Sequence, residues 1–151
     1  MKRFLTVLLC VIITMTFTSC RGERPAHELL SDFISAYGAE GIIYTPTAKE
    51  GEDGYATSEL LDKIFVYEGQ FPEDFALFLN SHVDYASECG VFVCESVEER
   101  SRVEEMCAER IRLIARGSNK SFISRSGLTV FYSTMTDRAR SEKIWGQILK
   151  R

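Results

Sequence analysis

The stretch ASECGVFVC, residues 86–94, restricts the fold more than any other part of the chain. In an extended strand, successive side chains point to opposite faces of the sheet. Both faces of this strand are apolar, with Cys89, Val91 and Val93 on one and Gly90, Phe92 and Cys94 on the other. This pattern is typical of an interior strand covered on both sides. We therefore expect residues 86–94 to lie inside a sheet.

The flanking segments predict the strand's neighbours. Residues 75–79, FALFL, read as a second strand, and the intervening NSHVD has the length and composition of a hairpin loop. Residues 96–117 then predict a long helix, because Ser96 and Glu99 form an S-x-x-E capping box and Gly117 supplies a stop. Its apolar stripe comprises Val103, Met106, Cys107, Ile111 and Ile114.

The rest of the chain predicts further elements around this centre: a helix at 25–38, a strand at 41–45, a short helix capped by Thr57 or Ser58, a strand at 126–135 and a helix at 137–150. The fold class is therefore α+β, with a small, mostly antiparallel sheet. Its middle six elements follow the β-α-β-β-α-β order of ferredoxin-like folds. Right-handed crossovers would place the two middle helices on one face of the sheet. The N- and C-terminal helices would then cover an edge or the other face.

The N-terminus predicts export. Lys2 and Arg3 precede an uncharged, mostly apolar run, and the run ends in FTSC, residues 17–20. This layout is that of a secretory signal, and the run is shorter than the roughly 20 apolar residues that a membrane span needs. Cleavage before Cys20 would remove residues 1–19 and leave Cys20 to carry a lipid. An ordinary signal-peptidase cut would instead release a secreted, soluble protein.

Residues 20–25 form only a short tether, and residues 26–151 have the size of one domain. The tether from Arg21 to Pro25 reaches about 17 Å when fully extended, so a lipid on Cys20 would hold the domain beside the outer face of the bacterial cell membrane. The net charge of −4, together with export, argues against nucleic acid as a partner. Acidic side chains predominate in residues 21–95 and basic ones in 110–151. The basic part could face anionic lipid headgroups or wall polymers, or these could be solvated helix faces.

FTSC, SECGVFVCES and MCAERIRLI together give the chain a wider resemblance. It resembles a family of small, uncharacterised lipoproteins from Gram-positive, clostridia-like bacteria. The resemblance implies an exported, lipid-anchored protein with the fold described above. It implies no activity.

The cysteines offer one candidate disulfide. Cys89 and Cys94 point to opposite faces of their strand and cannot bond to each other. Cys107 lies far enough along the returning helix to come near residues 89–91, so a bridge from Cys89 to Cys107 is one interpretation. Buried free thiols that pack as small apolar side chains are the other.

The sequence predicts no catalytic residue, no metal site and no cofactor. A cysteine nucleophile would need a histidine partner, and neither of the two histidines, His27 and His82, lies close to a cysteine in sequence. The C-x4-C spacing does not suit zinc. These observations do not select a reaction.

Arg110 does not fit the pattern of its helix, because it falls on the apolar stripe. Its guanidinium must reach solvent along its own stem or find a buried partner, for which Glu88 is the candidate. An anion-binding arginine beneath a cleft is the other interpretation. If the side chain reaches solvent, Arg110→Met should leave the protein folded.

Three functions are compatible with these observations. The first is a membrane-anchored, non-enzymatic binding module at the cell envelope, with an unidentified envelope protein or ligand as its partner. The second is an enzyme, such as a hydrolase of envelope material, and the third is a purely structural module. An enzyme should gather titratable groups in a pocket, whereas a binding module should expose an apolar patch or an open strand edge.

Overall fold

The computed structural model describes residues 24–80, 87–115 and 119–151. It contains one five-stranded sheet with the order β1-β2-β3-β5-β4, in which every neighbouring pair is antiparallel. The strands are β1 (Gly41–Tyr44), β2 (Asp74–Asn80), β3 (Glu88–Val93), β4 (Phe122–Ser126) and β5 (Thr129–Ser133). The helices are α2 (Ala26–Tyr37), α3 (Ser58–Ile64), α4 (Val97–Ala115) and α5 (Arg138–Ile148). The predicted α+β class is confirmed.

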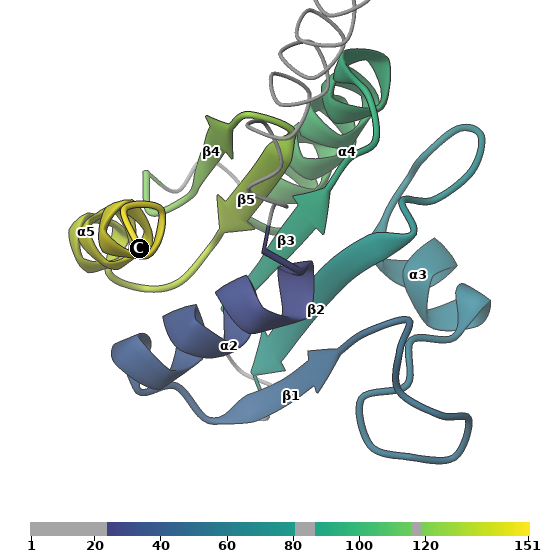
Figure 1. The fold of residues 1–151 in the computed structure, drawn as a ribbon, viewed down its shortest axis with the longest axis horizontal. Helices are drawn as coiled ribbons and strands as arrows, with labels where there is room; N and C mark the ends of the chain where they lie inside the picture. Colours follow the sequence, from purple (N-terminus) through teal and green to yellow (C-terminus); the bar gives the residue numbers. More distant parts are fainter. Residues whose placement is uncertain (1–23, 81–86, 116–118) are drawn as a thin grey trace, which may run out of the picture.

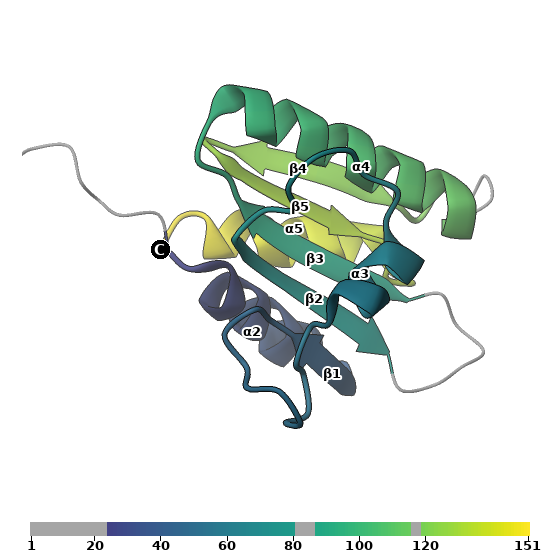
Figure 2. The same cartoon turned by 90° about the vertical axis from the view of Figure 1, so that its right-hand side faces the viewer.

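Helices cover both faces of the sheet, as the two apolar faces of β3 predicted (Figures 1 and 2). On one face, α2 and α5 pack on a core cluster that includes Cys89, Val91 and Phe131. On the other face, α3 and α4 pack on a second cluster that includes Phe92 and Tyr132. The central strand β3 contributes to both clusters, so the whole domain is organised around it.

Local sequence signals set the ends of the helices. Ser96 Oγ accepts a hydrogen bond from the N–H of Glu99 at 3.1 Å, and the carboxylate of Glu99 accepts from the N–H of Glu95 at 2.6 Å, so the capping function predicted for α4 is present. The first residue of α2 has a different arrangement, because Pro25 has no side-chain acceptor. The carboxylate of Asp74 on β2 accepts from the N–H of Ala26 at 3.1 and 3.3 Å. A residue remote in sequence therefore caps this helix.

Two features of the predicted topology are wrong. The strand order is not that of a ferredoxin-like fold, since β1 lies beside β2 and pairs with it antiparallel across the α3 connection. The crossover rule constrains only parallel strands, and it does not govern this connection. The prediction also missed β4, which pairs with β5 through the turn at Gly127. Polar residues make up most of this edge strand, which weakens its sequence pattern.

Gly90 lies at the centre of the sheet because a side chain would not fit there. A Cβ on this residue would lie 2.6 Å from a ring carbon of Tyr132 and 2.8 Å from Leu77 Cδ2. Both neighbours are fully buried in the cluster below α4. The missing side chain leaves room for the Tyr132 ring, whose hydroxyl reaches the polar cluster described next.

Within the described ranges, none of the helices combines the length and the apolar character that crossing a membrane requires.

Candidate functional site

A buried ion pair joins β3 to α4. Arg110 Nε and Nη2 donate to the two carboxylate oxygens of Glu88 at 2.8 and 2.6 Å. The Glu88 side chain is 7% exposed and that of Arg110 is 17% exposed. The structure thus brings together the two residues that the sequence proposed as a buried pair. The fork geometry uses both oxygens of the carboxylate, which makes this a strong, oriented contact.

Tyr132 on β5 completes the cluster. Its hydroxyl donates to Glu88 Oε1 at 2.8 Å, and its side chain is fully buried. Burial and the nearby Glu88 charge hold the pKa of Tyr132 well above its ordinary value, so the phenol stays protonated and remains a donor. Burial alone would lower the pKa of Arg110, but the hydrogen bonds and charge of Glu88 outweigh it and the pKa is raised. The guanidinium is therefore charged and already bound to an internal anion.

The three described cysteines are distributed over both faces of the sheet. Cys89, Cys94 and Cys107 are buried thiols. Cys89 belongs to the cluster below α2 and α5, whereas Cys94 and Cys107 belong to the cluster below α4. The Cys89–Cys107 bridge is not formed, because the two side chains lie on opposite faces of the sheet. Burial holds the pKa of both Cys89 and Cys107 well above the ordinary thiol value, which disfavours the reactive thiolate.

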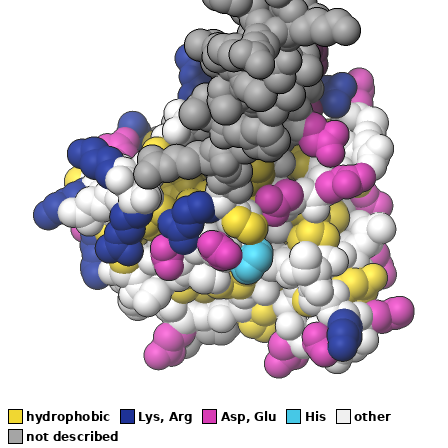
Figure 3. Space-filling model, in the orientation of Figure 1, with side chains coloured by type: hydrophobic (Ala, Val, Ile, Leu, Met, Phe, Trp, Pro, Cys, Tyr) yellow, Lys and Arg dark blue, Asp and Glu magenta, His cyan; other side chains and the backbone are white. Residues whose placement is uncertain are grey.

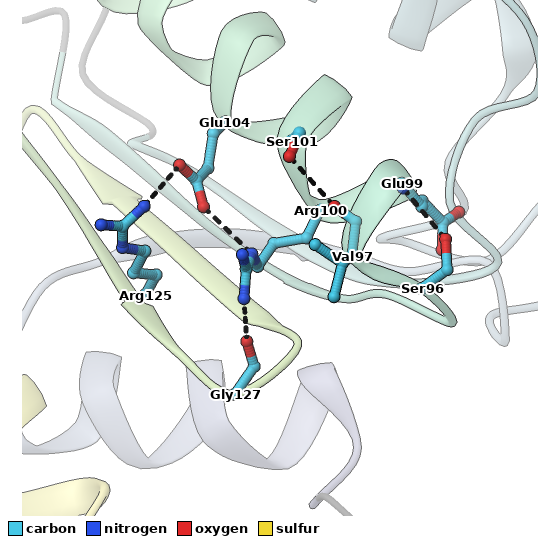
Figure 4. A network of polar contacts seen from close by, with 8 residues as sticks. All are labelled: Ser96, Val97, Glu99, Arg100, Ser101, Glu104, Arg125 and Gly127. Atoms are coloured by element: carbon cyan, nitrogen blue, oxygen red, sulfur yellow. Dashed lines mark hydrogen bonds and ion pairs between the residues drawn. The ribbon is translucent and has the colours of Figure 1, made fainter.

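A second polar network fixes one flank of α4 to the β4–β5 hairpin (Figure 4). Arg100 Nη1 donates to the carbonyl of Gly127 at 2.8 Å, and its Nε lies 3.3 Å from Glu104. Arg125 on β4 reaches the same carboxylate at 3.5 Å. This network links the helix, the hairpin turn and the edge strand. We assign it a structural role, because its members bond to one another and to the backbone.

The opposite flank of α4 borders an open groove. The groove encloses about 300 Å³ between α4 and the segment 66–72, which connects α3 to β2. Figures 1 and 2 both show this connection running beside α4. Its lining residues are Val66, Tyr67, Glu68, Gln70, Pro72, Glu99, Arg102, Val103, Glu105, Met106 and Glu109. Val66 is 66% exposed there, the highest value among the large exposed hydrophobic side chains of the described chain.

The groove combines an apolar floor with an acidic rim. Val103 and Met106 are buried at the floor, and four glutamates face one arginine around them. Glu99 is engaged in the helix cap and Glu109 is paired with Arg112. Among the described residues, Glu68 and Glu105 have no ion pair, so their charges are available to a ligand.

The sequence interpretation missed this groove. The residue types of segment 66–72 follow no helical or alternating apolar pattern, so the sequence did not predict that this segment forms a wall facing α4. One signal was present on the helix itself. Glu99, Arg102, Glu105 and Glu109 recur at a spacing of three to four residues beside the apolar stripe, which places them along one flank. That segment 66–72 faces these residues was shown only by the tertiary structure.

Some predicted features lie outside the described residues, namely Cys20, the signal peptide, most of the tether and His82. In the part of the chain that is described, no group of three or more His, Cys, Asp or Glu side chains could hold a metal ion. No protein-family model, curated protein or solved structure matches the chain.

Proposed function

We propose that this chain is an exported, lipid-anchored protein of the bacterial cell envelope whose domain is a binding module. The observation that carries the binding role is the open groove beside α4, where Val66 is exposed next to a buried apolar floor and unpaired carboxylates. Exposed apolar surface rimmed by polar groups is typical of an interaction site. The order of charged, apolar and small residues before Cys20 supports the anchor.

The charge distribution supports this assignment of surfaces. Lys and Arg side chains gather over α5 in Figure 3, whereas the groove rim on the other side of the sheet is acidic. Two of the basic residues have structural contacts, since Arg138 pairs with Glu142 and Arg140 lies over the ring of Tyr37 at 4.9 Å. The groove and the surface over α5 therefore differ in the sign of their charge.

Replacing the proposed lipidation site tests the anchor. Cys20→Ala should move the protein from the membrane fraction to the medium or leave an unprocessed precursor, because no thiol remains to receive the acyl chains. Two acyl chains give stable anchoring at about 0.8 kcal/mol per buried CH₂. Cell fractionation and intact-mass analysis provide the measurement, with Cys94→Ala as the control for loss of a thiol. Unchanged processing and membrane retention of Cys20→Ala would contradict lipidation.

Site-specific photo-cross-linking in the native cells tests the binding role. Benzoylphenylalanine at position 66 should give discrete, reproducible cross-linked products, because Val66 lies exposed at the groove. The matched control is the same photo-reactive residue at position 113, since Leu113 is 42% exposed on α4 and does not line the groove. Products of the same size and yield at both positions, or none at position 66, would contradict a partner in the groove.

A further inference from the structure

The first part of the groove wall, residues 65–68, has the form of a short unpaired strand, which ends at Gly69, where φ is +83°. Its side chains alternate, with Phe65 buried, Val66 exposed, Tyr67 half-buried and Glu68 exposed. Phe65 has extended backbone angles, φ −117° and ψ 144°. The backbone N–H and C=O groups of residues 66–71 form no hydrogen bond with any described residue. This edge can therefore pair with another extended chain.

The wall is held in place before any ligand arrives. The Tyr67 and Phe71 rings meet edge to face with centroids 4.9 Å apart, and Phe71 also lies 5.7 Å from Phe65. Tyr67 Oη donates to Asp62 on α3 at 3.2 Å. The facing helix is fixed on its other flank by the Arg100–Glu104–Arg125 network. A groove with two fixed walls lowers the ordering cost of binding.

The charge of the groove selects the ligand chemistry. Glu68 stands on the strand-like wall and Glu105 on α4, and neither has an ion pair within the described chain. These carboxylates would attract a cationic side chain placed in the groove, whose lining holds four glutamates and one basic residue, Arg102. Val103 and Met106 offer the apolar floor to an uncharged side chain beside it.

We propose that this groove binds an extended peptide segment of a partner protein in which basic and apolar residues alternate. The peptide backbone pairs with residues 66–68, its apolar side chains lie over Val103 and Met106, and its Lys or Arg side chains meet Glu68 and Glu105. This inference names the ligand of the proposed binding module and rests on that function for its cellular setting. Binding itself depends only on the fold.

Direct binding to a defined probe tests the inference. The probe is the fluorescein-labelled, C-terminally amidated peptide Lys-Val-Lys-Val-Lys, and the full chain is held in phosphatidylcholine nanodiscs, with empty discs as the blank. Fluorescence anisotropy should show saturable binding. The double variant Glu68→Gln/Glu105→Gln should weaken it roughly three- to tenfold, the range expected for two exposed ion pairs. Glu98→Gln, an exposed carboxylate on α4 outside the groove, should change the affinity less than twofold.

Altered probes separate backbone pairing from charge. The same peptide with N-methylated valines should bind at least tenfold more weakly, because two backbone donors are lost, and Glu-Val-Glu-Val-Glu should not bind. Equal affinity for the wild type and the Gln double variant, or for the methylated probe, would overturn the inference. If spermine displaced the probe with the same affinity as the unlabelled peptide, the ligand would be a small polycation and the inference would be overturned. Concentration-dependent dimerisation that excludes the probe would overturn it in favour of a second copy of the chain.

The two proposals fail in different ways. Cross-linking at position 66 with no binding of the basic peptide would contradict the peptide inference and leave the envelope-binding role supported. Specific peptide binding with no cross-linked product in cells would support the peptide inference and contradict the envelope-binding role.

Discussion

Arg110→Met is expected to lower the free energy of unfolding by about 2–4 kcal/mol, because it leaves the Glu88 carboxylate buried without its counter-charge. Methionine keeps the apolar stem of the side chain and removes only the guanidinium. Tyr132 still donates one hydrogen bond to Glu88, which replaces a small part of the lost interaction. Urea unfolding of the full chain, followed by the fluorescence of the single tryptophan, Trp145, measures the effect.

Two further variants make this prediction specific to the pair. Arg112→Met is the matched control, because Arg112 lies on the same helix with its side chain 70% exposed and should change stability by no more than about 0.5 kcal/mol. The double variant Arg110→Met/Glu88→Gln should be about 1–2 kcal/mol more stable than Arg110→Met alone, since the unpaired charge is gone. If Arg110→Met and Arg112→Met behave alike, the guanidinium contributes as a solvent-facing group and the pair is not a stabilising contact.

Phe131→Ala is expected to have the largest effect of all, about 3–5 kcal/mol, through the cavity it would leave. Phe131 is fully buried on β5 and stacks on Trp145 of α5, with ring centroids 4.2 Å apart and planes 14° apart. It also meets Phe33 of α2 at 4.9 Å. One ring thus joins both helices to this face of the sheet. A domain of this kind has a total stability of about 5–15 kcal/mol, so the loss is a large share.

Circular dichroism measures this second prediction, because the substitution itself alters the surroundings of Trp145. The near-ultraviolet signal of the stacked tryptophan should fall, and the midpoint of urea unfolding in the far ultraviolet should shift strongly. Ile42→Ala is the control, an apolar strand residue that is 40% exposed at the edge of the sheet and should cost about 1 kcal/mol or less. Equal losses for the two variants would show that Phe131 does not join the helices to the sheet.

Predictions that depended on local pattern were confirmed. The helix expected at residues 25–38 is α2, Ser96 caps the start of α4 by accepting from the N–H of Glu99, and Asp137 begins α5 by accepting from the N–H of Arg140 at 2.9 Å. The caps of α4 and α5 act over three to four residues, so the sequence contains that information, whereas the start of α2 also depends on Asp74, which is remote in sequence. The apolar faces of residues 86–94 also led correctly to a strand covered on both sides.

The incorrect predictions depended on distant contacts. Strand alternation alone showed that Cys89 faces away from Cys94, but it did not show which of the two faces α4 covers. Of the two interpretations of the cysteines, the buried thiols are present and the Cys89–Cys107 bridge is not, because the two side chains lie in clusters on opposite faces of the sheet. The strand at 122–126 was missed because its sequence pattern is weak and it is a strand only through its pairing with β5. A short edge strand is identified only with its neighbour in place.

The sequence by itself determined the types of the elements, most of their ends, and the presence of apolar surface on both faces of the central strand. Helical and strand periods and caps arise from neighbouring residues, which is why they can be read along the chain. Only the tertiary structure decided the strand order and the groove between α4 and residues 66–72, and it selected the Glu88–Arg110 pair from the sequence alternatives. The Glu88–Arg110 pair, the two walls of the groove and the β1–β2 and β3–β5 pairings join segments separated by 20 or more residues in the chain, and their geometry depends on which surfaces the core brings into contact.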